Sequence, residues 1–175
     1  MLQNLAITAL GKYSPRLLEN FSKSLNDCGC SITASRMTVL GNEFSCMMML
    51  SGSWDSIAKL DNILPKIGDE LDLAIQFRRT EQYLSAVDLM PYAIDVVCVA
   101  HLGIIHNIAK FFADNNILVH DMYTSNYRAT TTGAQMFSLH MSINIPTSNS
   151  IASIRGEFME FCDRLNMDAI MEPVK

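Results

Sequence analysis

The stretch LGKYSPRLLENF, residues 10–21, places a glycine, a basic residue and an aromatic residue directly before an expected helix. Ser14 is a good N-cap, and Pro15 suits the first helical position, where its missing N–H is not needed. A turn from a strand to a helix N-terminus offers free backbone N–H groups to a small anion such as a carboxylate. The candidate binding residues at this turn are Gly11, Lys12, Tyr13, Ser14, Arg16 and Leu17.

Arg16 permits opposite hypotheses about this turn. A guanidinium at a helix N-terminus is disfavoured by the helix dipole unless an anion offsets it, so Arg16 could pair with the carboxylate of a ligand or of another domain. Its long side chain could equally obstruct the approach of a ligand to the backbone, which a glycine would permit. The turn could also do no more than connect a strand to a helix. The sequence leaves these readings open.

The pattern recurs after 87 residues. Leu17, Leu18, Phe21 and Leu25, expected to form one apolar helical face, fall on Ile104, Ile105, Ile108 and Phe112. The turn positions 13–16 fall on Ala100-His101-Leu102-Gly103, which makes His101 and Gly103 the candidate binding residues of the second copy. The start of the next expected strand completes the candidate set with Cys30, Ser31 and Ile32.

Each copy is expected to contain four strands and two helices. In the first copy we expect strands over residues 3–10, 30–40, 43–52 and 71–79, with helices over 15–28 and 54–66. In the second we expect strands over 92–99, 117–126, 134–144 and 167–174, with helices over 102–115 and 148–164. Gly41-Asn42 is typical of a tight hairpin, Ser53 of a helix cap, and Pro65 with Gly68 of a helix end.

The order βαββαβ favours an α+β, ferredoxin-like layout, in which an antiparallel four-stranded sheet carries both helices on one face. We expect two tandem domains, at residues 1–80 and 91–175, with a linker at 81–90. A connector of about a dozen residues cannot separate domains widely, so we expect the two to pack together. Exposed strand edges favour side-by-side pairing of the two sheets.

Composition narrows the classes of function. The net charge is -5 and the 13 Lys and Arg residues are scattered, which argues against direct binding of nucleic acid. No apolar run approaches the roughly 20 residues of a membrane helix, and no signal peptide is recognisable, so we expect a cytoplasmic protein without membrane contact. Five cysteines fit the reduced thiols of a cytosol.

No motif typical of an enzyme is present. His101 and His106 lie five residues apart on an expected helix and should not share a face. Cys28-Gly29-Cys30 together with Cys46 could suggest a soft-metal site, but buried structural thiols explain these cysteines better. We therefore expect no catalytic residue, no metal and no cofactor.

Three segments resemble the glycine cleavage system transcriptional repressor family: ITALG at 7–11, CGCSITASRMTVLGNEF at 28–44 and LSGSW at 50–54. The resemblance implies two tandem ACT domains, which are small amino-acid-sensing modules. It also implies a repressor that acts through a LysR-type activator without contacting DNA. Ligand-binding ACT domains commonly carry Asp-x-Pro-Gly at the first turn, whereas residues 13–16 read YSPR, so the proline is kept and the aspartate and glycine are lost.

Three functions can be weighed on these observations. The first is a transcriptional regulator that senses a small, glycine-like amino acid and contacts a transcription factor. The second is an ACT-type protein-interaction module that has lost ligand binding. The third, an RNA-binding ferredoxin-like domain, is disfavoured because the expected central strands carry methionine and threonine in place of paired aromatic residues. The ligand, the partner's surface and the formation of a homodimer are left open.

Overall fold

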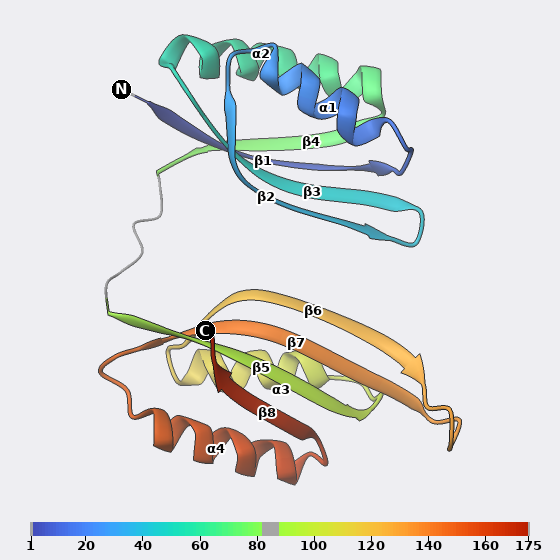
Figure 1. Ribbon diagram of the computed structural model, residues 1–175, viewed down its shortest axis with the longest axis vertical. Coiled ribbons are helices and arrows are strands. Elements are labelled where there is room, and N and C mark those ends of the chain that lie inside the picture. The colour runs from blue at the N-terminus through green and yellow to red at the C-terminus, as the bar shows by residue number, and fades with distance from the viewer. Residues whose placement is uncertain (1, 82–87, 175) are drawn as a thin grey trace. The chain divides into compact units, whose positions relative to one another are not determined.

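The chain repeats one order of elements, βαββαβ, in two compact units on either side of residues 82–87 (Figure 1). The computed structural model describes residues 2–81 and 88–174. The first unit consists of β1 (Gln3–Lys12), α1 (Leu17–Asn26), β2 (Ser31–Leu40), β3 (Glu43–Gly52), α2 (Trp54–Leu71) and β4 (Leu73–Thr80). The second consists of β5 (Leu89–Val99), α3 (Ile104–Asp114), β6 (Leu118–Arg128), β7 (Gln135–Pro146), α4 (Ile151–Arg164) and β8 (Asp168–Pro173).

Each unit contains one antiparallel four-stranded sheet. The strand order is β2-β3-β1-β4 in the first unit and β6-β7-β5-β8 in the second. Both helices of a unit lie on one face of its sheet (Figure 1). The predicted fold class, two tandem ferredoxin-like units, is confirmed, and the side-by-side pairing of the two sheets stays a prediction.

The repeat extends to an irregularity of the edge strands. The β2–β3 register shifts between Ile32 and Ala34, and the β6–β7 register shifts between Val119 and Asp121. Ile32 and Val119 are 87 residues apart, which is the period found in the sequence. The two units therefore share the same strand pairing down to the position of one β-bulge.

Alternation along the inner strands builds a separate core in each unit. On β3, Phe44, Cys46, Met48 and Leu50 are buried and the residues between them are not, as expected for a sheet with one covered face. The helices supply every third or fourth residue to the same core, including Phe21 from α1. Apolar periodicity alone therefore accounts for most of the elements.

The first helix begins later than predicted. Arg16 is its N-cap residue, with φ −98° and no side-chain cap, and Ser14 instead accepts a backbone hydrogen bond from Leu17 at 3.1 Å. Residues 14–17 thus form a tight turn ahead of the helix, with Pro15 and Arg16 at its centre. Leu18 is also not part of the buried face, because it is 38% exposed.

The second helix runs through the residues predicted to end it. Helix α2 continues past Pro65 and Gly68 to Leu71 and ends at Asp72, which has a left-handed conformation. A proline removes one backbone donor, and the buried residues Leu64 and Ile67 on either side of it hold the helix against the core. Two other predictions are confirmed: Ser53 caps α2 through the N–H of Ser56, and Gly41-Asn42 forms the turn between β2 and β3.

The expected linker, residues 81–90, overlaps the start of β5. Strand β5 begins at Leu89, so the last two residues of that range pair with β7. Residues 82–87 lie outside the described part of the chain. The limits of the two domains near the linker remain a prediction.

Candidate functional site

The first candidate turn, between β1 and α1, is closed by backbone hydrogen bonds. The N–H of Tyr13 donates to the carbonyl of Asn42 at 2.9 Å, which ties the turn to the β2–β3 hairpin. Arg16 stands at the helix start, and Glu19 lies in the first helical turn. A carboxylate side chain at that place counteracts the positive end of the helix dipole, which makes this turn less favourable for an anionic ligand.

The candidate residues of the first unit do not come together. Gly11 pairs with Phe44 at one end of β3, whereas Ser31 pairs with Ser51 at the other end. The span from Phe44 to Ser51 along the strand is about 23 Å. Because antiparallel pairing reverses the chain, it is the end of β2 that approaches the turn within this unit. Gly11 to Leu17 lie around the turn, and Cys30, Ser31 and Ile32 lie far from it.

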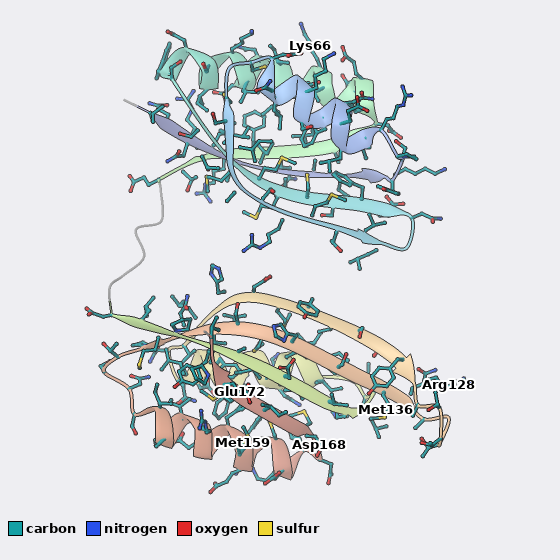
Figure 2. The ribbon with its side chains drawn as sticks, in the orientation of Figure 1. Lys66, Arg128, Met136, Met159, Asp168 and Glu172 are labelled. Carbon is teal, nitrogen blue, oxygen red and sulfur yellow. The ribbon has the colours of Figure 1, made fainter. Side chains whose placement is uncertain are left out.

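The candidate turn of the second unit borders a cavity of about 490 Å³. Its wall combines the turn and the start of α3 with residues from β6 and β7. The lining residues are Ala100, His101, Leu102, Gly103, Ile104, Ile105, His106, Asn126 and Phe137. Arg128 and Met136 mark the hairpin end of β6 and β7 (Figure 2), and Phe137 follows directly after Met136. His101 and Gly103, both predicted from the sequence, are thus brought to one cavity.

Gly103 gives this turn its shape. It is the N-cap residue of α3 with φ +89°, a conformation that L side chains rarely adopt, and no side chain caps the helix. The first N–H groups of an α-helix have no partner inside the helix. The start of α3 therefore presents backbone donors at the edge of the cavity.

His101 and His106 line the same cavity, although the sequence predicts that they share no helical face. Helix α3 begins at Ile104, so His101 belongs to the turn and not to the helix in which it was expected. Helical periodicity therefore does not separate the two rings. Nδ1 of His101 donates to the carbonyl of Leu102 at 3.0 Å, which leaves Nε2 of the neutral ring as an acceptor.

Asn126 and Phe137 are the lining residues that the sequence did not indicate. They face each other across the β6–β7 pair, so both side chains lie on the helix side of the sheet. Asn126 brings an amide that can donate and accept, and Phe137 brings an apolar surface. Finding them requires knowing which residues of β6 and β7 pair with each other, and the sequence alone does not specify this pairing.

Three exchanges distinguish the two copies of the turn. Sheet register places Val39 opposite Phe44 in the first unit, as Asn126 is opposite Phe137 in the second. At equivalent positions the first unit has Arg16, Glu19 and Val39, and the second has Gly103, His106 and Asn126. A long basic side chain, an acidic group and an apolar residue in the first unit thus correspond to a glycine, an imidazole and an amide in the second. The second turn therefore has a glycine at its helix N-cap and no acidic residue in the first turn of its helix.

The cysteines are buried in the two cores, as expected. All five are free and buried. Burial raises the pKa of each thiol, and that of Cys162, which also lies near Asp163, rises to about 12. Since the thiolate and not the thiol is the nucleophile, these groups are poorly suited to nucleophilic catalysis. Among residues 2–81 and 88–174, no group of three His, Cys, Asp or Glu side chains is placed to hold a metal ion, and no helix is long and apolar enough to cross a membrane.

The chain is similar to proteins of a known family. Residues 3–78 match the ACT domain family. The chain is 31% identical over 166 residues to the glycine cleavage system transcriptional repressors of Escherichia coli K12 and of Shigella flexneri, covering 93% of this chain and 85% of each relative. The chain is therefore similar, over nearly its whole length, to proteins that regulate transcription.

Solved structures show the same fold over the entire chain. A crystal structure assigned to a glycine cleavage system transcriptional repressor has a TM-score of 0.75 at 24% identity, covering 100% of this chain and 99% of that one. A protein from Galdieria sulphuraria has a TM-score of 0.80 at 18% identity, with 100% of both chains covered. The two curated relatives are named as repressors of transcription. The chain belongs to the glycine cleavage system transcriptional repressor family and consists of two tandem ACT domains.

Proposed function

We propose that this protein is a cytoplasmic regulator that senses a small amino acid at the second-unit cavity and acts by contact with a LysR-type transcription activator. The observation that carries the proposal is the set of exchanges at the two turns, where Gly103, His106 and Asn126 replace Arg16, Glu19 and Val39. Membership of a repressor family supports the regulatory role. The alternative, an interaction module without a ligand, is favoured by the first turn, where Glu19 lies in the first turn of α1 and disfavours an anion.

The cavity offers partners for both charged ends of an amino acid. Its carboxylate would accept hydrogen bonds from the free N–H groups at the start of α3, where the helix dipole also favours negative charge. Its ammonium group would donate to Nε2 of His101 or to the side-chain oxygen of Asn126, both of which lie in the cavity wall.

Exchanging the residues of the two turns tests the sensing site. We expect Gly103→Arg to abolish binding of glycine and serine, because the new side chain is strained at φ +89° and fills the approach to the helix start. Calorimetric titration of the purified protein measures this. Arg16→Gly in the first unit is the matched control and should leave binding at the second unit unchanged. Equal heats of binding in wild type and Gly103→Arg would show that the ligand binds elsewhere. If Arg16→Ala weakened binding by about 1.5–3 kcal/mol, the ligand would bind at the first turn.

A separate experiment tests whether the protein regulates transcription through a protein partner. A chain with net charge -5 should not form a specific complex with promoter DNA alone, because neutralising phosphates requires clustered basic residues. We expect a mobility-shift assay to show no shift with the protein alone, and a changed shift when the activator is added. A specific, salt-sensitive complex formed without the activator would contradict the proposal.

A further inference from the structure

The second sheet carries a row of polar side chains across three neighbouring strands. Tyr123 of β6 lies opposite His140 of β7, and His140 lies opposite Asp95 of β5. The strand residues on either side of His140 and of Asp95 are buried under the helices, so this row lies on the open face of the sheet. The Tyr123 and His140 rings are stacked with centroids 4.9 Å apart, and Nδ1 of His140 donates to Oδ1 of Asp95 at 2.7 Å. The carboxylate thus holds the imidazole, and the imidazole supports the tyrosine ring, which is 65% exposed.

The same open face is acidic. Asp168 and Glu172 lie on the edge strand β8 (Figure 2), on either side of Ile170, which pairs with Asp95. Among the described strand residues that point to this face, none is Lys or Arg. Carboxylates without neighbouring cations create a negative potential, which favours contact with a positively charged surface.

The first sheet shows that the fold does not require this row. Its equivalent row consists of Arg36, Met47 and Thr8, without an aromatic ring or a carboxylate. At the position of Glu172 the first sheet has Arg78. Both sheets have the same strand order, so the acidic and aromatic surface is specific to the sequence of the second unit.

We infer that the open face of the second sheet is the surface that contacts the activator, and that it binds an arginine-bearing, basic patch of that protein. The inference rests on the proposed function, in which the protein acts through an activator. A guanidinium group of the partner stacks on the exposed face of the Tyr123 ring, and the carboxylates of Asp95 and of β8 supply the negative charge. Arginine fits this surface better than lysine, because its planar and weakly hydrated group both stacks on aromatic rings and pairs with carboxylates.

The affinity of the full chain for the purified LysR-type activator, measured by biolayer interferometry, tests this surface. Tyr123→Ala should weaken binding by at least about tenfold, as expected for an aromatic residue at the centre of an interface. Tyr123→Phe keeps the ring and should stay within about threefold of wild type. The double variant Asp168→Asn with Glu172→Gln should slow association by roughly threefold to tenfold and reduce its dependence on salt. Circular dichroism checks that each variant is folded.

A matched control removes the same charge from the opposite side of the unit. Glu157 and Glu160 lie on α4, which covers the other face of the sheet. The double variant Glu157→Gln with Glu160→Gln should leave the affinity within about twofold of wild type, because exposed charges at that separation are screened.

A pair of peptides tests which cation is recognised. A peptide of alternating arginine and glycine should displace the activator at a concentration roughly fivefold lower than the same peptide with lysine. Equal displacement by both peptides would exclude the guanidinium as the recognised group.

Other results would overturn the inference in distinguishable ways. If Tyr123→Ala bound the activator as tightly as wild type, the contact would lie elsewhere, and the proposed route through an activator would stand. If the α4 control weakened binding as much as the β8 variant, net charge rather than this face would be responsible. If light scattering showed self-association of wild type that Tyr123→Ala abolished, with activator binding unchanged, a second copy would occupy the face. Absence of binding between wild type and the activator would overturn both the inference and the proposed route.

Discussion

Replacing Phe158 with alanine is expected to lower the free energy of unfolding of the second unit by about 3–5 kcal/mol. Phe158 lies on α4, is fully buried, and packs against Phe112 of α3 with ring centroids 5.1 Å apart. Phe111 and Phe161 complete the cluster at 5.3 and 6.2 Å from Phe158. Truncation would leave a cavity between the two helices that the surrounding rings cannot close, because each is held by several neighbours.

Denaturant unfolding followed by circular dichroism, with hydrogen exchange to locate the loss, measures this effect. Phe161→Ala is the matched control, because Phe161 belongs to the same cluster and is only partly buried. Its cost should be clearly smaller. A loss below about 1 kcal/mol for Phe158→Ala, or amide protection lost in residues 2–81 and retained in 88–174, would contradict the assignment of this cluster to the second core.

Replacing Gly11 with alanine is expected to destabilise the first unit by about 3 kcal/mol, the upper part of the range for overpacking. A Cβ atom at this position would clash with the carbonyl oxygen of Asp72 and would stand 2.8 Å from Cδ2 of Leu73. The first contact is to backbone, which cannot move without shifting the end of α2 and the start of β4. Gly11 pairs with Leu73 in the β1–β4 register, so the strain acts on the sheet itself.

The single tryptophan reports on this variant, because Trp54 begins α2 in the first unit. Its fluorescence during denaturant unfolding should show the loss of stability. Gly156→Ala is the control: a Cβ atom added to this glycine of α4 in the second unit would meet nothing within 4 Å. Alanine should stabilise that helix by up to about 1 kcal/mol, measured by circular dichroism, and should leave the Trp54 transition of the first unit unchanged. If Gly11→Ala kept its stability and lost amino-acid binding, the sequence-based assignment of Gly11 to the ligand site would be supported over this packing role.

Much of the fold follows from local patterns in the sequence. Apolar residues at every second position predict the strands, and apolar residues at every third or fourth position predict the helices. Ser53 and Gly41-Asn42 specify a cap and a turn through chemistry that acts within a few residues. The 87-residue repeat then reproduces the whole arrangement, because equivalent patterns give equivalent elements.

Predictions about single residues failed where contacts between residues far apart in the sequence determine burial or the end of a helix. Leu17 and Leu18 are equally apolar, and only the position of α1 over the sheet makes the first buried and the second exposed. Pro65 ends many helices, but here burial of Leu64 and Ile67 maintains α2. Local propensity is a weak force compared with packing, so tertiary contacts determine these outcomes.

In the candidate site, too, some features follow from the sequence and others only from the tertiary structure. The sequence by itself determined that two turns precede helix N-termini, and it identified His101 and Gly103. Tertiary structure decided that His106 and Asn126 join them, and that Cys30 lies at the far end of the first sheet. The physical reason is strand register: antiparallel pairing brings together residues far apart in the chain and separates others that share a motif, and register depends on the packing of the whole sheet.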